Sequence, residues 1–216
     1  MKRKQFRTYK REECIVFHKT DDPFGGLSNM AGGYPIYVSG ICIRTSEALY
    51  QACRFPHLPE VQNMIIHEGS PITAKRKTKQ FIDDSRPDWY QVRINIMRWC
   101  LKMKLMSNSE IFGSLLLSTD DKTIVEESYK DEFWGAKPSS DGGTFIGMNV
   151  LGRLLMELRE QIKDTGLESF QKVKPPNIEG FNLFNTSIKT EPSTDSYIED
   201  SFISLVADEN QQSLFD

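Results

Sequence analysis

The sequence predicts an α+β fold: a compact, mostly helical single domain with small β elements, followed by a flexible C-terminal extension. The 216 residues, of which 38% are hydrophobic and 26% charged, are enough for one domain with a buried core. Short β-prone runs gather between residues 13 and 43, whereas helical patterns fill most of residues 59–106. After Gly166 the composition changes to Asn, Ser, Thr and acidic residues, which is typical of a flexible extension.

These changes divide the chain into a basic N-terminal arm (1–12), a domain (13–165) and an acidic, partly disordered extension (166–216). The extension has three lysines and nine acidic residues, so its net charge is −6, and the total of −3 leaves +3 for the rest of the chain. A basic arm is able to contact nucleic-acid phosphates, although such arms are more often solvated ends. The extension either docks on a partner or on its own domain.

Small β elements are expected at the start of the domain and after its longest helix. Cys14–Phe17 is a short apolar run of the kind that forms a strand. Residues 34–38 and 41–43 flank Ser39-Gly40, which suits a hairpin turn. Residues 122–126 alternate in polarity and include β-branched side chains, so they also predict a strand.

Capping residues mark where the first helices begin. Thr45 or Ser46 caps one helix, and Pro59–His67 forms the next. Ser70 caps a third helix, which has a proline in its first turn. Because its continuation over residues 74–79 is strongly basic, we expect that part to face solvent.

Three further helices complete the predicted domain. Residues 87–106 form the longest one, in which an apolar stripe runs beside a stripe of aromatic, basic and sulfur-containing side chains. Residues 109–117 form a short helix. Asn149 caps a final amphipathic helix, whose inner face should carry Leu151, Leu154, Leu155, Leu158 and Ile162.

The segment Thr45–Phe55 is the most informative part of the chain. Glu47, Gln51 and Arg54 are spaced i, i+4 and i+7 and therefore share one helix face, at the end where the helix dipole favours a carboxylate. Such a set can hold a sugar or a phosphate and polarise a bond. The alternative interpretation is a solvated face with an ordinary helical ion pair.

Two further motifs suit a binding site. In Asp131–Gly135 an acid precedes a Trp and a Gly in a loop after a strand, so the indole can stack on a base while the carboxylate orients a sugar or a water molecule. The simpler alternative is a turn whose Trp fills the core. Residues 147–152 place a glycine before a helix N-terminus, which is able to bind an anion through its backbone N–H groups.

Together these motifs favour cleavage of a glycosidic bond in a phosphorylated ribose compound. That reaction passes through an oxocarbenium-like state, which a carboxylate stabilises while an acid or base handles the water. The candidates are the acids Glu47, Glu126 and Asp131, the rings Trp89 and Trp134, and the cations Arg54, Arg93 and Lys104.

Other classes of chemistry have no motif in this sequence. There is no P-loop or G-x-G-x-x-G, and the three histidines and four cysteines lack metal-ligand spacing, so neither a cofactor nor a metal is inferred. The scattered cysteines indicate free thiols in a reducing cytoplasm. Because the basic N-terminus has no apolar stretch behind it and no run is long enough to cross a bilayer, we expect no secretory signal and no membrane association.

The order of the motifs resembles the NADAR, or YbiA-like, domain family over about residues 13–163. Each motif is weak alone, whereas the ordered set is specific. The matching segments are Phe24–Met30, Ile36–Gly40, Thr45–Phe55, Ser70–Lys75, Leu115–Thr119, Ile124–Glu126, Asp131–Gly135 and Gly147–Arg159, with Trp89, Arg93, Met97 and Lys104 between them.

The resemblance implies a compact, largely helical α+β domain and an N-glycosidase activity. Some members of the family cleave phosphoribosyl-amine intermediates of riboflavin synthesis, and others remove ADP-ribose from guanine in nucleic acid, which counters a toxin. By position, Glu47 and Asp131 are the catalytic acids. The residues expected to bind or support the substrate are Asn29, Arg54, Trp89, Arg93, Lys104, Glu126, Trp134, Gly135, Asn149 and Gly152.

Departures from the family pattern leave the substrate open. Ala48 stands where the family has a histidine, Arg54 replaces a lysine, and Leu105 replaces an aromatic residue. Ala48 keeps a second hypothesis open, namely a module that binds ADP-ribose or a related nucleotide without cleaving it. A third hypothesis is a nucleic-acid-binding scaffold that uses the basic arm.

The partners implied are a ribosylated or ADP-ribosylated small molecule or nucleic-acid base. For the acidic tail, three roles stay open: it mimics nucleic acid, binds a toxin, or has no role.

Overall fold

The computed structural model describes residues 6–192, which form an α+β fold as the sequence predicts. Its helices are α1 (Ser46–Ala52), α2 (Pro59–His67), α3 (Pro71–Lys77), α4 (Trp89–Ser107), α5 (Ser109–Leu117) and α6 (Val150–Thr165). Its strands are β1 (Arg7–Lys10), β2 (Cys14–Phe17), β3 (Ile36–Val38), β4 (Ile41–Ile43), β5 (Thr123–Glu126), β6 (Lys137–Pro138), β7 (Thr144–Gly147), β8 (Lys172–Val173), β9 (Asn182–Leu183), β10 (Thr186–Ser187) and β11 (Glu191–Pro192).

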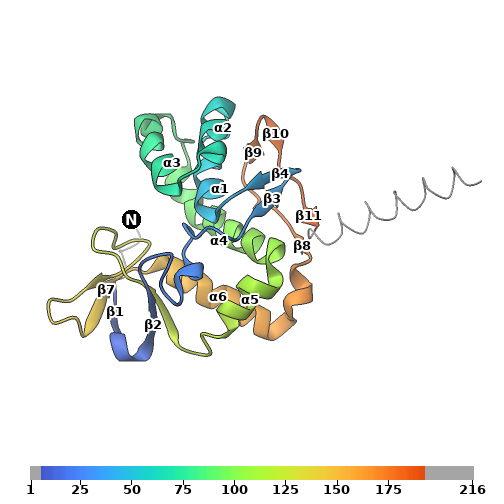
Figure 1. Cartoon of the computed structure of the whole chain (residues 1–216). Coiled ribbons are helices and arrows are strands. Elements are labelled where there is room, and N and C mark those ends of the chain that lie inside the picture. The colour runs from blue at the N-terminus through green and yellow to red at the C-terminus, as the bar shows by residue number, and fades with distance from the viewer. Residues whose placement is uncertain (1–5, 193–216) are drawn as a thin grey trace, which may run out of the picture.

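Helix α4 runs through the middle of the molecule and packs against α1, α5 and α6 (Figure 1). Helices α1 to α3 lie together on one side of it, and the strands β1, β2 and β7 lie on the other side (Figure 1). Both predicted stripes of α4 are buried, including Trp99 and Met103 on one and Met97 and Cys100 on the other. The remaining face of α4 is solvated, since Gln91 and Asn95 are exposed on it.

The strands form small sheets rather than one large one. β2 pairs in parallel with β5, so that Phe17 lies opposite Glu126, and α6 packs on β5. β3 and β4 form the predicted antiparallel hairpin, in which Ser39 (φ 50°) and Gly40 (φ 78°) adopt the left-handed conformations that a two-residue hairpin turn needs.

The domain begins before residue 13, because Arg7–Lys10 is a strand rather than part of a free arm. β1 pairs with β7 in the three-stranded sheet β1-β7-β6. Next to it, the Arg11 guanidinium donates to Glu127 and to the Gly142 carbonyl, each at 2.9 Å, and lies 4.3 Å from the centre of the Phe145 ring. Arg11, which was predicted to belong to the basic arm, therefore makes its contacts within the domain. Residues 1–5 of that arm lie outside the described residues.

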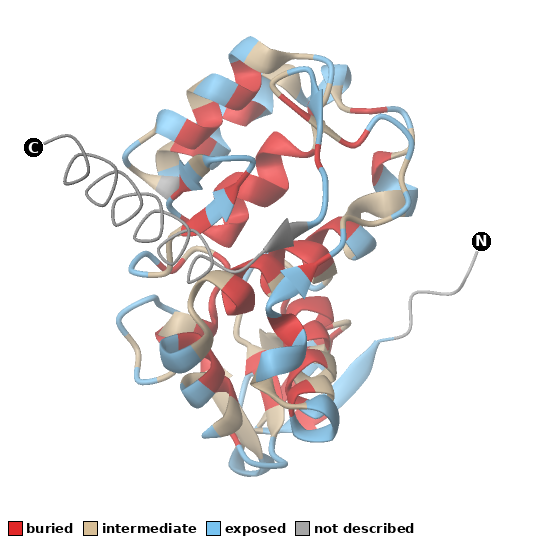
Figure 2. Cartoon of the chain, turned by 90° about the vertical axis from the view of Figure 1, so that its right-hand side faces the viewer, coloured by how far each residue is buried: buried red, intermediate tan, exposed pale blue. Residues whose placement is uncertain are grey.

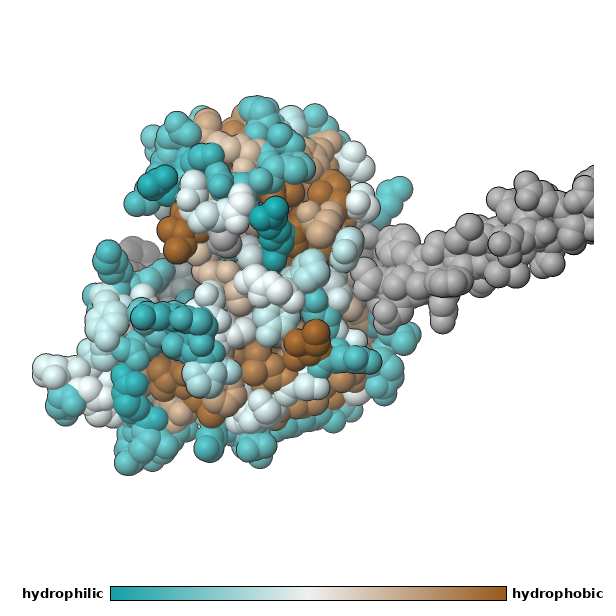
Figure 3. Space-filling model, viewed as in Figure 1, coloured by the Kyte–Doolittle hydropathy of each residue, from teal (hydrophilic) through white to brown (hydrophobic). Residues whose placement is uncertain are grey.

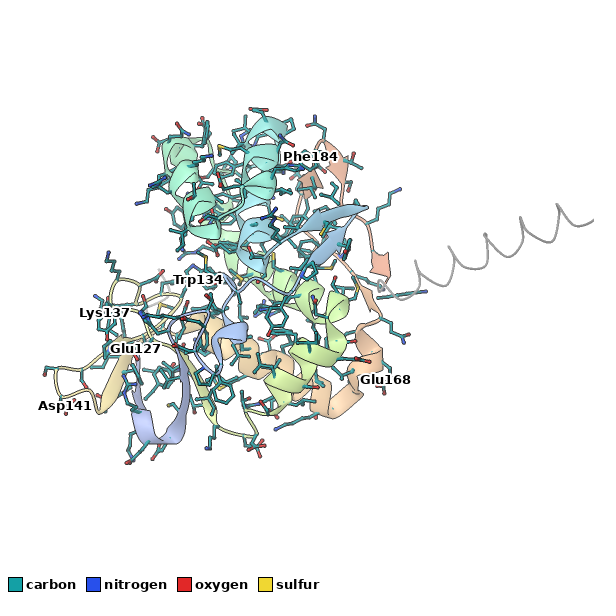
Figure 4. All side chains as sticks on the ribbon, viewed as in Figure 1. Glu127, Trp134, Lys137, Asp141, Glu168 and Phe184 are labelled. Atoms are coloured by element: carbon teal, nitrogen blue, oxygen red, sulfur yellow. The ribbon has the colours of Figure 1, made fainter. Side chains whose placement is uncertain are left out.

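The start of the C-terminal extension docks on its own domain. The Phe181 ring packs edge-on against Trp99 at 5.0 Å, and both are buried. The Gln62 side chain on α2 donates to the Asn182 carbonyl and accepts from the Phe184 N–H. Figure 4 shows Phe184 beside α2. Of the two predicted alternatives, docking on the domain therefore holds up to residue 192, and the remaining residues lie outside the described part.

The burial pattern follows the predicted helices. Figure 2 shows buried residues concentrated along the inner faces of the helices, with exposed residues on outer turns and loops. Hydrophilic side chains cover most of the rim of the molecule (Figure 3). All four cysteines are free thiols, as predicted. Within residues 6–192, none of the helices has the length and apolar character that crossing a bilayer requires.

Candidate active site

The predicted acids meet in one cavity of about 270 Å³, called here the central cavity. It is formed by α1, α3, the first turns of α4, the end of β5 and the loop that follows β5. Figure 4 shows Trp134, from that loop, near the middle of the molecule, between the α1–α3 side and the sheet side. The lining residues are Asn29, Met30, Glu47, Tyr50, Gln51, Arg54, Lys75, Trp89, Arg93, Glu126, Ser128, Asp131 and Trp134.

Glu47 is held at the first turn of α1 by hydrogen bonds to its backbone and its carboxylate. The Thr45 hydroxyl caps the helix by accepting from the Ala48 N–H, and the Glu47 N–H donates to the Asn29 carbonyl. The Glu47 carboxylate accepts from the Asn29 amide at 2.5 Å and from the Gln51 amide at 2.9 Å. With only 3% of its side chain exposed, Glu47 has one orientation, toward the cavity.

Glu126 and Asp131 line the same cavity from β5 and the loop that follows it. Glu126 ends β5, and burial, reinforced by the nearby Asp131 carboxylate, raises its pKa to about 7. Asp131 lies in the following loop, where its Oδ1 accepts from the Phe133 and Trp134 N–H groups at 2.8 and 2.9 Å. One oxygen of Asp131 thus fixes the loop that presents Trp134 to the cavity.

Lys75 is the cation among these acids, and it is not one of the residues predicted for the site. Its ammonium lies 3.5 Å from the Glu47 carboxylate. Glu47 is the main cause of the raised pKa of Lys75, and Glu126 and Asp131 act in the same direction. The expectation that residues 74–79 face solvent holds for Lys75, whose side chain is 54% exposed, although its ammonium reaches back to a buried carboxylate. It is wrong for Ala74 and Thr78, which are buried.

Three aromatic rings form a wall of the cavity. Tyr50 packs against Trp89 with ring centres 4.9 Å apart and edge-on against Trp134 at 5.5 Å. Trp89 and Trp134 are predicted site residues, whereas Tyr50 was missed, although it stands on the same short helix as Glu47. Its spacing of three residues from Glu47 is the signal that could have identified it.

Two predicted arginines complete the lining. The Arg54 guanidinium donates to the Ser85 hydroxyl at 2.6 Å and lies 5.2 Å from the Trp89 ring centre. The Arg93 guanidinium lies 3.7 Å from the Phe133 ring centre. Arg54 follows the end of α1 at Ala52, so it reaches the cavity from beyond the helix rather than along its face.

Two buried polar atoms of the lining residues have no partner within the described part of the chain. They are the Gln51 side-chain oxygen and the Arg93 Nε. Because unpaired buried polar atoms are costly, their presence is typical of a site that a ligand completes.

Lys104 does not line the central cavity, in contrast to the prediction that it contacts a substrate anion. Its side chain is fully buried, and its ammonium donates to the Gly26 and Ser28 carbonyls at 2.5 and 3.1 Å. The Tyr34 and Phe112 rings lie 4.3 and 4.4 Å from the nitrogen. Lys104 thus fastens the loop just before Asn29.

Asn149, Gly152 and Gly135 also lie outside the lining and support it instead. The Asn149 amide accepts from the Glu126 N–H and donates to the Ile124 carbonyl, so it fixes the end of β5. It therefore does not act as the predicted side-chain cap of α6. A Cβ at Gly152 would lie 2.2 Å from the Ile124 carbonyl, and one at Gly135 would lie 2.6 Å from the Glu126 carbonyl. Only glycine allows these close approaches.

The start of α6 is not the anion site that residues 147–152 suggested. The N–H groups of residues 148–151 all donate to carbonyl oxygens of the loop residues 132–135, at 2.7 to 3.0 Å. These bonds use the donors that an anion would need. They hold the Trp134 loop against α6 instead.

The site therefore combines three carboxyl groups, an ammonium, two guanidinium groups and three rings around one small cavity. Such a set can bind the phosphate of a phosphorylated sugar and pack rings against the C–H face of the sugar. It can also transfer a proton at the anomeric carbon. Within residues 6–192, no group of three or more His, Cys, Asp or Glu side chains has an arrangement suited to a metal ion.

Comparisons with known proteins identify relatives over the same part of the chain. The model of the NADAR domain matches residues 16–163. The chain is 36% identical over 152 residues to N-glycosidase YbiA of Escherichia coli (strain K12), which covers 70% of this chain and 90% of YbiA. It is 36% identical over 155 residues to the riboflavin biosynthesis protein VVA0006 of Vibrio vulnificus (strain YJ016); that match covers 71% of this chain but only 40% of the Vibrio protein.

The NMR structure of E. coli YbiA is similar in fold. The two structures superimpose with a TM-score of 0.61 at 35% sequence identity, over 72% of this chain and 88% of the YbiA chain. The predicted fold class and family resemblance are both confirmed.

Proposed function

Because this chain belongs to the NADAR domain family, we propose that it is an N-glycosidase that hydrolyses the N-glycosidic bond of a ribosyl-phosphate or ADP-ribosyl compound. The observation that carries the proposal is the convergence of Glu47, Glu126 and Asp131 on one cavity. Relatives named N-glycosidase support the type of bond.

We assign a part of the substrate to each wall of the central cavity. Arg54 and Arg93 bind the phosphate, since guanidinium groups match its geometry. The rings of Tyr50, Trp89 and Trp134 pack against the ribose and exclude water from it. Glu47, with both oxygens fixed, lies where a positive charge develops at C1′.

The proposed reaction moves one proton to the leaving nitrogen and one away from water. Glu126 donates its proton to the nitrogen as the C1′–N bond breaks, which its raised pKa allows near neutral pH. The water oxygen bonds to C1′ and gives a proton to the free oxygen of Asp131. Transfer of that proton to Glu126 restores both acids, and no step uses a metal ion.

Among the two substrate classes, a phosphoribosylated heteroaromatic amine is favoured. The Vibrio relative is named a riboflavin biosynthesis protein. A cavity of about 270 Å³ also suits a ribosyl phosphate better than a complete ADP-ribose. ADP-ribosyl guanine is the second candidate.

The test is release of ribose 5-phosphate from a phosphoribosyl-aminopyrimidine, followed by mass spectrometry. We expect turnover by the natural chain and a loss of about 100-fold or more in Glu47→Gln and Asp131→Asn, with unchanged circular dichroism. Glu127→Gln is the matched control, because Glu127 binds Arg11 and does not line the cavity. Full activity in both acid variants would refute the assignment of the site.

A non-catalytic nucleotide-binding module is the remaining alternative, because Ala48 removes a histidine that the family pattern has beside Glu47. Calorimetry of ADP-ribose binding would then give saturable binding, while long incubation with each substrate class would yield no product.

A further inference from the structure

A second, more open cavity of about 460 Å³, called here the outer cavity, adjoins the central one. Glu126 and Met30 line both cavities, so these two residues stand at the boundary between them. The other residues of the outer cavity are His18, Lys19, Thr20, Asp21, Ser28, Ser70 and Ile72.

We propose that the outer cavity binds the aglycone, a flat heteroaromatic amine, while the ribosyl phosphate occupies the central cavity. The inference rests on the proposed function. It assigns the C1′–N bond to the boundary beside Glu126, so that the carboxyl group shared by both cavities faces the nitrogen that leaves.

The chemistry of the outer cavity matches such a ring. Within the described part of the chain, the side-chain polar groups of Lys19, Thr20 and Asp21 have no hydrogen-bond partner and are therefore free to bind a ligand. They supply donors and an acceptor, as the N–H and C=O groups of an aminopyrimidine require. Met30 and Ile72 supply apolar contacts for the ring faces.

A second phosphate fits this lining less well than an aromatic ring. Two carboxyl groups, Asp21 and Glu126, line the outer cavity beside the single ammonium of Lys19. The central cavity also has three carboxyl groups, but three cations, Lys75, Arg54 and Arg93, accompany them there, and the two guanidinium groups provide the stronger anion site. The distribution of charge therefore places the phosphate end of the substrate in the central cavity.

The rim of the outer cavity is open, which bears on specificity. Ile72 is 73% exposed, and His18 is also exposed, with the Tyr129 ring packed edge-on against it at 5.6 Å. An aglycone bound there keeps one edge in solvent. We therefore expect the enzyme to select strictly for the ribosyl phosphate and less strictly for substituents on the outer edge of the ring.

The experiment uses the two products as separate probes, in calorimetric titrations of the full chain. Ile72→Trp fills the outer cavity, so it should weaken binding of a diaminopyrimidine about tenfold or more and change that of ribose 5-phosphate less than twofold. Arg93→Met should show the opposite pattern. Ile111→Trp, at an isoleucine of α5 that is 65% exposed and outside both cavities, is the control and should change neither.

Three outcomes would overturn the inference: Ile72→Trp weakening only ribose 5-phosphate, Ile72→Trp changing neither probe, or the natural chain binding no diaminopyrimidine. The first would move the phosphate to the outer cavity. Turnover of the phosphoribosyl-aminopyrimidine by the natural chain is measured in parallel. Its absence refutes the proposed function itself, whereas turnover with any of the three binding results refutes only the assignment of the outer cavity.

Discussion

The Lys75 ammonium lies 3.5 Å from the Glu47 carboxylate, so an ion pair joins α3 to α1 at the central cavity. The Glu47 side chain is 3% exposed and that of Lys75 is 54% exposed. The exposed lysine therefore supplies the positive charge that balances the buried Glu47 carboxylate. Because Lys75 also interacts with Glu126 and Asp131, it is the cation that allows three carboxyl groups to share one small cavity.

Lys75→Met should lower kcat/KM by about 100-fold, because it removes the charge that orients and balances the catalytic carboxylate. Lys77→Met is the matched control, two residues along the same helix, where the lysine pairs with Glu68 instead. Steady-state kinetics on both variants test this. Equal effects of the two substitutions would mean that Lys75 contributes only to the stability of α3.

Glu126 should set the alkaline limb of the pH profile. Burial raises its pKa to about 7, so the protonated form that donates to the leaving nitrogen is lost as the pH rises through 7. We expect kcat/KM to fall above about pH 7. In Lys75→Met this limb should move to higher pH, since Lys75 holds the pKa of Glu126 down.

Glu126→Gln checks the same assignment through stability. A carboxyl group whose pKa is raised in the folded state destabilises that state once it ionises, so stability falls as the pH rises from about 4.5 to about 7. Urea unfolding of Glu126→Gln should therefore show a larger gain over the natural chain at pH 8 than at pH 5. A gain that does not change with pH would show that Glu126 keeps an ordinary pKa.

Local signals in the sequence predicted most of the helices. Thr45 and Ser70 cap α1 and α3 through contacts within one turn, to the N–H groups of Ala48 and Thr73. Capping depends on neighbouring residues only, and it is therefore visible in the sequence. Asp131 and Trp134 were likewise predictable as a unit, because the bond between them closes a single turn.

Residues whose roles depend on the tertiary structure were assigned less well. Arg93 and Lys104 share a stripe of α4, yet eleven residues separate them by about 16 Å along the helix, too far for both to reach one small cavity. Periodicity predicts on which side of a helix a residue lies, but not which part of the structure surrounds the helix at that residue. Lys75 was missed because a run of basic residues predicts a solvent-exposed segment. Composition does not show that one lysine of the run reaches a buried carboxylate.

Phe181→Ala should lower the free energy of unfolding by about 3–5 kcal/mol, because it removes a buried ring from its contact with Trp99. Activity at 25 °C should remain, since Phe181 lies outside the central cavity. Phe6→Ala, at a phenylalanine that is exposed, is the control and should have little effect. Chemical denaturation measures both. An unchanged stability in Phe181→Ala would mean that the docked segment contributes nothing to the fold.

Lys104→Met should reduce activity although Lys104 touches no substrate. The substitution leaves the Gly26 and Ser28 carbonyls without their donor, at a cost of about 1–3 kcal/mol, and frees the loop that places Asn29 on Glu47. Lys102→Met, on the same helix, is the control and should leave activity unchanged. Steady-state kinetics measured at a temperature where Lys104→Met is still folded separate this effect from unfolding.

The pH dependence of stability gives Lys104 a signature of its own. Burial lowers the pKa of Lys104 from about 10.5 to about 7, so between these values the unfolded chain holds a proton that the folded chain has lost. The stability that Lys104 confers on the natural chain should therefore rise with pH above 7, by up to about 1.4 kcal/mol per pH unit, and Lys104→Met should lack this rise. Urea unfolding at pH 6, 7, 8 and 9 measures the difference between the two proteins. If that difference stays constant from pH 6 to pH 9, the ammonium is stabilised by its two carbonyls and two rings strongly enough to keep its proton throughout.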